Sequence, residues 1–173
     1  MSERLRRLVR EIPGFPRPEV LFRDITPLLA DASALTEAID GLAADAAPLA
    51  PDYVLAAEAR GFVLGAALAV RLGAGLLLAR KPGRLPRATV SAAYQLEYGS
   101  DSLEVHDDPL QPGQRVLVHD DLLATGGTAC ALCELTERLG GEVAGASFLV
   151  ELESLGGRAR LAPRPVRSLV AYA

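Results

Sequence analysis

Short apolar runs alternate with helix-like segments along this chain, and the alternation constrains the fold more than any other feature. The apolar runs occupy residues 53–57, 75–79, 115–118 and 143–150. Segments that favour helices precede or separate them, at residues 32–47, 61–72 and 129–139. Strands that are apolar along their length are typical of a parallel sheet covered on both faces. We therefore expect an α/β fold with an open, mostly parallel sheet flanked by helices.

Length, composition and charge exclude several classes of protein. A chain of 173 residues, 50% apolar and 23% charged, suits one globular domain and excludes wholesale disorder. The formal net charge of −4 argues against a nucleic-acid surface, which depends on phosphate contacts. No uncharged apolar run approaches the roughly 18 residues of a membrane span, and the N-terminus lacks the apolar stretch of a secretory signal. Two cysteines cannot form a disulfide framework, which fits a reducing compartment, so we expect a cytoplasmic protein. From the net charge and the absence of a long apolar run, we expect neither a nucleic-acid nor a membrane partner.

Two segments depart from the alternation. Residues 2–11 favour a short basic helix, and the proline-rich residues 12–18 cannot continue it, so we expect an ordered extended arm there. Later, two strand-like runs flank the turn-forming residues 98–101, which indicates a β-hairpin or flexible flap inserted into the core. We expect one domain over residues 1–173, with an N-terminal hood over about residues 1–35 and a flap over about residues 81–107.

The most informative segment for chemistry spans residues 116–129. It reads as a buried strand, two adjacent carboxylates, a turn of small residues and a helix start. Ligands of open α/β sheets bind beyond the carboxyl ends of the strands, where this turn lies. Asp120 and Asp121, one loop away from the turn, suit vicinal sugar hydroxyls. The turn suits a phosphate monoester because it offers backbone N–H groups, two hydroxyls and a helix dipole; it consists of Ala124, Thr125, Gly126, Gly127 and Thr128.

A simpler interpretation stays open for the turn alone, in which Asp121 caps a backbone group and the two glycines only close a corner. The segment is neither a Walker loop nor a dinucleotide-binding fingerprint, because it lacks both glycine patterns. The whole pattern is far more specific than its glycine pair. It resembles the 5-phosphoribosyl 1-pyrophosphate (PRPP) signature of the type I phosphoribosyltransferases, a hydrophobic strand followed by Asp-Asp and then Ala-Thr-Gly-Gly-Thr.

Within that family the chain is similar to the adenine phosphoribosyltransferases over almost its whole length. Five further segments resemble, in order, the adenine-binding segment, the pyrophosphate loop, the start of the flap, its catalytic segment and a late strand near the base: residues 21–28, 58–62, 80–86, 94–99 and 149–152. Glu19 and His119 depart from the family pattern, at positions without an expected chemical role. The resemblance implies the type I phosphoribosyltransferase fold. It also implies transfer of a phosphoribosyl group from PRPP to adenine, giving AMP and pyrophosphate.

For PRPP, the resemblance implies a role for each part of the site. Asp120 and Asp121 would hold the ribose hydroxyls, and residues 124–128 would bind the 5′-phosphate. Mg²⁺ would be chelated mainly by PRPP, with no direct protein ligand and with one of the two carboxylates reaching it through water. The cations that would neutralise pyrophosphate are Arg60, Arg80 and Lys81. The lysine is the only one in the chain, beside 17 arginines, and it offers a compact charge on a flexible stem.

For the base, the resemblance implies that Phe22 stacks on adenine and that backbone groups near Leu21 and Arg23 select it. Glu97 would exchange a proton with the purine ring, and Tyr98 would help to close the flap. The expected catalytic residues are therefore Glu97, Arg60 and Lys81. Structural alternatives stay open: exposed charges at Arg60 and Glu97, a solvated turn at Arg80 and Lys81, and a core aromatic at Phe22.

Membership of this family implies a homodimer that binds PRPP and adenine. Two other functions stay open, a phosphoribosyltransferase for another purine such as xanthine or hypoxanthine and a non-catalytic, PRPP-sensing regulator. The regulator predicts an appended DNA-binding segment and a basic surface, whereas the segment before Phe15 is short and the net charge is negative.

Two short motifs favour packing over chemistry. Cys130 and Cys133 form C-x-x-C, but no second pair or suitably spaced histidine accompanies them, so we expect two small buried residues of a helix rather than a redox or zinc site. Gly61 and Gly65 form G-x-x-x-G in a helix too short to span a membrane. We expect these glycines to allow close helix–sheet packing.

Overall fold

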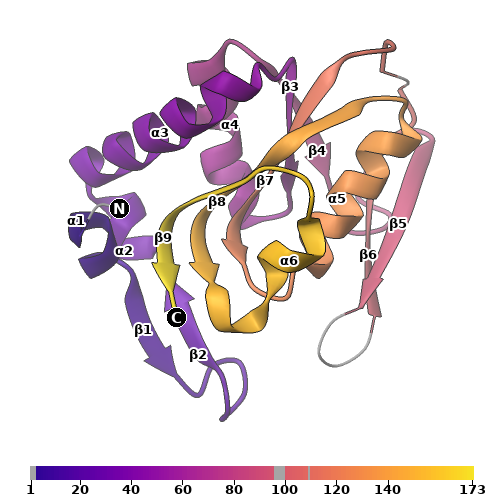
Figure 1. Ribbon diagram of the computed structural model, residues 1–173. Coiled ribbons are helices and arrows are strands. Elements are labelled where there is room, and N and C mark those ends of the chain that lie inside the picture. Colours follow the sequence, from indigo (N-terminus) through magenta and orange to yellow (C-terminus); the bar gives the residue numbers. More distant parts are fainter. Residues whose placement is uncertain (1–2, 96–99, 109) are drawn as a thin grey trace.

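A parallel sheet of five strands forms the centre of the structure, in the order β4-β3-β7-β8-β9 (Figure 1). The computed structural model describes residues 3–95, 100–108 and 110–173. The strands of the sheet are β3 (Tyr53–Ala57), β4 (Gly75–Ala79), β7 (Arg115–Leu123), β8 (Glu142–Leu152) and β9 (Val166–Tyr172). Every neighbouring pair is parallel, which confirms the expected sheet. The fifth strand, β9, was not predicted.

The strand order reverses next to β3, and this reversal positions the site. From β3 the chain moves outward to form β4, and it later returns to the other side of β3 to form β7. In open α/β sheets such a reversal leaves a crevice beyond the carboxyl ends of the strands. Ala57 ends β3 and Leu123 ends β7, so the segments that follow these two residues border the crevice.

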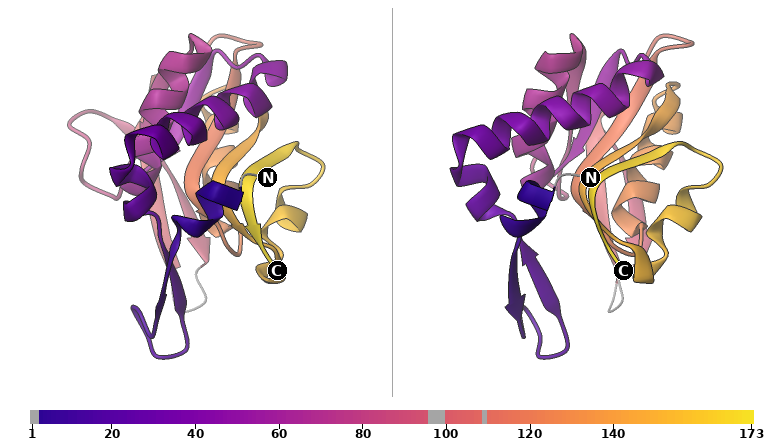
Figure 2. Two further views of the ribbon diagram at one scale, coloured as in Figure 1. Left: turned by 90° about the vertical axis from the view of Figure 1, so that its left-hand side faces the viewer. Right: turned by 60° about the vertical axis from the view of Figure 1, so that its left-hand side comes forward.

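Helices cover both faces of the sheet (Figures 1 and 2). One face packs against α3 and α4 in a core that includes Leu42, Leu64 and Leu117. The other face packs against α5 around Leu132 and Phe148. The helices are α1 (Glu3–Arg7), α2 (Thr26–Ala30), α3 (Ala32–Ala46), α4 (Arg60–Leu72), α5 (Gly127–Arg138) and α6 (Gly157–Leu161), with 3-10 turns at Ala47–Leu49 and Glu153–Leu155. Within the described residues, no helix combines the length and apolar character that a membrane crossing requires.

Two glycines bring α4 close to the sheet. A Cβ added to Gly65 would lie 2.7 Å from the Cβ of Ala56 on β3, and one added to Gly61 would lie 2.9 Å from Oδ1 of Asp120 on β7. Real side-chain carbons do not approach this closely, so a side chain at position 65 would force α4 and β3 apart, and one at position 61 would displace the carboxylate of Asp120. The expected close helix–sheet packing is confirmed, and it brings the first turn of α4 against the aspartate pair.

The N-terminal hood differs from the predicted helix and extended arm. The helix predicted over residues 2–11 is described only over Glu3–Arg7, and the chain then forms β1 (Arg10–Pro13). This strand pairs antiparallel with β2 (Leu21–Asp24), so part of the proline-rich arm belongs to a hairpin. Pro13 is tolerated because it ends the strand. The hairpin extends from the end of the molecule at which the sheet strands finish, next to β9 (Figures 1 and 2).

The inserted hairpin of the flap is confirmed. It consists of β5 (Thr89–Gln95) and β6 (Ser100–His106), which pair antiparallel with Tyr94 opposite Asp101. Asp101, expected in the turn, belongs to β6. The hairpin packs against α5 through buried side chains that include Leu103 and Val105. A backbone bridge between Arg80 and Glu104 joins the end of β4 to this hairpin.

Candidate active site

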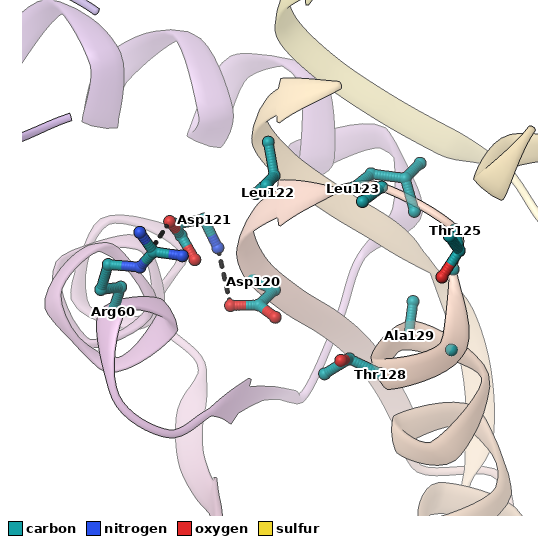
Figure 3. Close-up of a pocket in the computed structure, with 11 residues that line it drawn as sticks. Arg60, Asp120, Asp121, Leu122, Leu123, Thr125, Thr128 and Ala129 are labelled. Atoms are coloured by element: carbon teal, nitrogen blue, oxygen red, sulfur yellow. Dashed lines mark hydrogen bonds and ion pairs between the residues drawn. The ribbon is translucent and has the colours of Figure 1, made fainter. Parts of the chain in front are cut away.

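A pocket opens at the carboxyl end of β7, beside the first residue of α4 (Figure 3). Its lining brings together Arg60, both aspartates and the whole turn of small residues, as the sequence predicted: Arg60, Asp120, Asp121, Leu122, Leu123, Ala124, Thr125, Gly126, Gly127, Thr128 and Ala129. The pocket therefore occupies the crevice at which the strand order reverses.

The two aspartates belong to β7 itself, not to a loop after it. The predicted strand ended at Val118, but pairing with β8 continues from Asp120, opposite Phe148, to Leu123, opposite Glu151. A paired strand fixes the backbone of both aspartates more firmly than a loop does. Sequence reasoning missed this part of the strand because it begins with polar and charged residues, whereas such reasoning identifies buried strands by their apolar runs.

The environments of the two carboxylates differ. Asp121 is buried, and its Oδ2 lies 3.0 Å from Nε of Arg60. Asp120 is half-buried, and its Oδ1 accepts a hydrogen bond of 2.9 Å from the backbone N–H of Asp121 (Figure 3). Burial, and next the negative charge of Asp121, raise the pKa of Asp120 well above its usual value. The pair thus presents one carboxylate paired with a cation and one whose pKa is raised.

The turn of small residues leads into the N-terminus of α5. Gly126 precedes the helix with a φ of +82°, a conformation that favours glycine, and no side chain caps the helix start. The first N–H groups of a helix have no partner within the helix and carry its positive dipole end. This arrangement presents donors to an anion in the pocket.

Each of the three predicted pyrophosphate cations has a carboxylate partner, and only Arg60 lines the pocket. Nε of Arg80 lies 3.0 Å from Oε2 of Glu58, which also accepts a hydrogen bond of 3.1 Å from the backbone N–H of Lys81. That backbone hydrogen bond is the main reason why the pKa of Glu58 is lowered. Arg80 and Lys81 therefore lie at the base of the flap, outside the pocket lining.

The lysine side chain is held by the flap hairpin. Nζ of Lys81 pairs with Oδ2 of Asp101 and lies 3.3 Å from the hydroxyl of Tyr94. Burial by itself lowers the pKa of Lys81, but the hydrogen bonds with Asp101 and Tyr94 outweigh it and leave the pKa raised. The ammonium group is therefore charged at neutral pH. Sequence reasoning predicted the cation but neither partner, because a hairpin register determines which side chains meet.

Comparison with known proteins places this geometry in a family. The phosphoribosyl transferase domain family matches residues 25–163. An adenine phosphoribosyltransferase of Rubrobacter xylanophilus is 57% identical over 97% of this chain and 91% of its own length. The crystal structure of adenine phosphoribosyltransferase from Thermoanaerobacter pseudethanolicus is 49% identical, covers 98% of this chain and 99% of its own, and superposes with a TM-score of 0.95.

The chain belongs to the adenine phosphoribosyltransferase family. The likeness extends to a structure from Saccharomyces cerevisiae in complex with adenine and an imino-altritol bisphosphate, at 32% identity and a TM-score of 0.88 over 97% of this chain and 96% of that one. The expected family, fold and enzyme class are thereby confirmed.

The hood brings an aromatic ring to the pocket, beside Arg60. Phe22 is half-buried, not part of either core cluster, and its ring centroid lies 5.0 Å from Cζ of Arg60. The side chain of Arg23 lies elsewhere, with its Cζ 3.8 Å from the ring centroid of Tyr172. The Arg23 side chain thus contacts Tyr172 and Glu11, and Leu21, two residues before it, is exposed. Glu97 and Tyr98, predicted for proton exchange and flap closure, lie outside the described residues.

Sequence reasoning also missed the support behind the turn at residues 124–128. Nη1 of Arg160, on α6, donates a hydrogen bond of 3.0 Å to the backbone oxygen of Thr125. Gly157, also on α6, touches the backbone of Gly126. The adjacent glycines at positions 156 and 157 were the only signal for this contact, and they do not indicate which segment they approach.

Both cysteines of the C-x-x-C pair lie on α5. Both are free thiols on a helix, as expected; Cys133 is buried as predicted, whereas Cys130 is only half-buried. Burial raises the pKa of Cys133 to about 11, so its thiol is unreactive at neutral pH. In the described parts of the chain, no group of three or more His, Cys, Asp and Glu side chains is placed to hold a metal ion.

Proposed function

We propose that phosphoribosyl transfer to adenine takes place in the pocket at the carboxyl end of β7, with the PRPP phosphate on the turn and the ribose on the aspartates. The observation that supports this most directly is the sequence of features along one strand and helix. Two carboxylates of β7 are followed by an uncapped helix start, and a cation of α4 faces them. Hydroxyl acceptors beside an anion site match a phosphorylated sugar.

The 5′-phosphate binds at residues 124–128. Backbone N–H groups of the turn and of the α5 N-terminus, with the hydroxyls of Thr125 and Thr128, donate to the phosphate oxygens. Asp120 and Asp121 accept from the 2′ and 3′ hydroxyls of the ribose. Asp121 is buried and paired with Arg60, whereas Asp120 is half-buried, so the two carboxylates are not equivalent. Because they are not equivalent, they hold the sugar in one orientation.

Pyrophosphate leaves toward the three cations. Displacement at the anomeric carbon builds positive charge on the sugar and negative charge on the leaving group, so cations near the leaving oxygens lower the barrier. Arg60, Arg80 and Lys81 supply these charges, and each exchanges its present carboxylate partner for a pyrophosphate oxygen. The carboxylates keep the cations charged and in place before PRPP binds.

Adenine binds between the hood and the ribose. The ring of Phe22 stacks on the purine, and backbone groups of Leu21 and Arg23 select its edge. Glu97 exchanges the proton that the purine nitrogen loses when the new bond forms, and Tyr98 closes the flap over the site. The attacking nitrogen then lies close to the anomeric carbon, and the entropic cost of bringing the two reactants together is met by binding.

Phosphoribosyltransferases of this family generally use Mg²⁺ with PRPP, and the carboxylates fit such an ion. Mg²⁺ binds substrate phosphates together with one or two carboxylates and water, not a cage of protein ligands. Asp120 and Asp121 are two adjacent carboxylates, and among the described residues no third His, Cys, Asp or Glu side chain forms a metal-binding group with them. When bound, the ion neutralises part of the charge on pyrophosphate. Asp120 or Asp121 would hold the ion through water.

The whole chain acts as one domain that pairs with a second copy in a cytoplasmic homodimer. The pairing is supported by exposed apolar side chains: Leu76 and Leu78 are 37% and 40% exposed on β4, an edge strand, and Val70 is 82% exposed on α4. The free thiols suit a reducing compartment. Sedimentation velocity should give twice the chain mass of 18.2 kDa, and a monomer would contradict the pairing.

A panel of purines tests the function. The protein is incubated with Mg²⁺, PRPP and adenine, hypoxanthine, guanine or xanthine, and the nucleotide formed is measured. AMP formation with adenine, and little product with the other bases, is the expected result. Turnover with hypoxanthine but not adenine would contradict the proposal, and PRPP binding without turnover of any base would indicate a sensor.

A further inference from the structure

The short helix α6 lies directly behind the phosphate turn. Its first residue, Gly157, is buried, and a Cβ added there would lie 2.3 Å from the backbone oxygen of Ala124 and 3.0 Å from the backbone nitrogen of Gly126. The two backbones are therefore in contact, with no room for a side chain between them. Helix α6 therefore cannot move toward the turn unless the backbone of the turn also shifts.

A hydrogen bond adds to the backbone contact. Nη1 of Arg160 donates to the backbone oxygen of Thr125 at 3.0 Å. Because the peptide unit is planar and trans, fixing this oxygen also fixes the direction of the N–H of Gly126. The donors proposed for the 5′-phosphate thus depend on where α6 lies.

Helix α6 has five residues, too few for a stable helix by itself, and Arg158 fastens it to the sheet. Its Nε and Nη2 donate to the two carboxylate oxygens of Glu151 at 2.9 and 2.5 Å. Its other bonds, each 2.9 Å long, run from Nη1 to the backbone oxygen of Val166 and from Nη2 to Oγ of Ser168. The guanidinium therefore joins α6 to the end of β8 and the start of β9.

Glu151 is a buried carboxylate that holds the guanidinium of Arg158 in place. Its side chain is 3% exposed at the end of β8, and it accepts a further short hydrogen bond from Ser168. The hydrogen bonds from Arg158 lower the pKa of Glu151, so the carboxylate is ionised at neutral pH. Two-point pairing of a guanidinium with a carboxylate fixes direction as well as distance.

We propose that Glu151 and Arg158 are positioning residues for the 5′-phosphate site: through α6, they hold Gly157 against the turn at residues 124–126. Neither side chain lines the pocket in which PRPP is proposed to bind. The inference rests on the proposed binding of the 5′-phosphate at residues 124–128. Preorganised donors bind an anion better than donors that must be ordered on binding, so the pair acts on PRPP and not on adenine.

Arg158→Lys tests this role. Lysine keeps the charge but cannot bond both oxygens of Glu151 and the backbone of Val166 at once. We expect the KM for PRPP to rise about tenfold, with kcat and the KM for adenine changed less than about twofold. Gly157→Ala, which places a methyl group against the Ala124 oxygen, should raise the same KM.

Arg164→Lys is the matched control. Arg164 lies in the same connection between β8 and β9, but its Nη2 donates at 2.6 Å to Glu137 on α5, away from the turn. Its KM for PRPP should equal that of the wild type, and melting temperatures are measured for all three variants. Equal KM values for PRPP in Arg158→Lys and Arg164→Lys would overturn the inference, as would a lower melting temperature of Arg158→Lys with an unchanged KM. If the wild type itself does not use PRPP, the proposed function fails, and this assay reports that failure separately, before any variant is compared.

Discussion

Nε of Arg60 lies 3.0 Å from Oδ2 of Asp121, and this ion pair joins the start of α4 to β7 across the pocket. The same guanidinium lies over the ring of Phe22, so one side chain connects the hood with the aspartate pair. The arginine side chain is 43% exposed and the aspartate side chain 6% exposed. A ligand can therefore reach the cation while its partner stays buried. The contacts of Arg60 with Phe22 and Asp121 thus link the expected base site to the expected ribose site.

Phe22→Leu should weaken adenine binding. Stacking of a base on an aromatic ring contributes about 1–3 kcal/mol, so the KM for adenine should rise about tenfold while the KM for PRPP stays within about twofold. Phe15→Leu is the control. Phe15 is 54% exposed, and its ring packs edge-on against the ring of Phe22 with the two ring centroids 5.2 Å apart. Steady-state kinetics of both variants decide it; an unchanged KM for adenine in Phe22→Leu would mean that the ring does not stack on the base.

Lys81→Arg should lower kcat about tenfold while AMP binding stays within about twofold of the wild type. Lysine is a compact cation that can leave Asp101 for pyrophosphate, whereas the planar fork of arginine can bond both oxygens of Asp101 and remain there. Arg87→Lys, at an exposed pair with Asp108 before the same hairpin, serves as the control. Turnover and AMP titrations are measured on both. Full activity of Lys81→Arg would make the chain's single lysine interchangeable with arginine.

His119→Leu should make stability less sensitive to acid. His119 is fully buried, and within the described residues neither ring nitrogen has a well-formed hydrogen bond. Burial lowers its pKa to about 4, and the nearby backbone of Ser147 offsets only part of this effect. The unfolded chain therefore takes up the proton first, and this contribution to stability, present above about pH 6.5, is lost as the pH falls toward 4.

Unfolding by urea at several pH values measures this effect. Between pH 7.5 and 4, the free energy of unfolding of the wild type should fall by up to roughly 3 kcal/mol more than that of His119→Leu. The comparison between the two proteins removes the contribution of the carboxylates, which titrate in both. Parallel pH curves would show that the imidazole is not held neutral in the folded state.

Gly65→Ala should destabilise the fold. The added methyl group would lie 2.7 Å from the Cβ of Ala56, and overpacking of this kind costs about 1–3 kcal/mol. Gly41→Ala is the control, since its methyl group would meet only the flexible end of Leu169 at 3.2 Å, and alanine favours a helix over glycine. Denaturant unfolding should rank Gly65→Ala below the wild type and Gly41→Ala at or above it. Equal stability of the two variants would contradict the close approach of α4 to β3.

The sequence predicted the elements that local patterns determine. The strands over residues 53–57 and 75–79 match the structure, because their apolar runs are continuous. β9 was missed because Arg167 and Ser168 interrupt its apolar residues at the sheet edge. The strand at residues 115–118 was predicted too short for the same reason, since its last part carries His119 and the aspartates.

The contacts between distant segments could not be read from local patterns. The turn at residues 124–128 was predicted from its small residues, but its contact with Gly157 depends on how α6 returns to the sheet. The pairing of Lys81 with Asp101 depends on the register of the flap hairpin. Sequence motifs therefore predicted which groups the site contains, whereas tertiary structure determines which groups hold them.

The most direct test of the account is the KM for PRPP of the double variant Asp120→Asn with Asp121→Asn, measured with saturating adenine and Mg²⁺. Amides keep the size of the carboxylates but remove the charges that accept from ribose hydroxyls and pair with Arg60. We predict that the KM for PRPP rises at least about 100-fold while circular dichroism still reports a folded α/β protein. A folded double variant with nearly normal PRPP use would contradict the assignment of this pocket as the PRPP site.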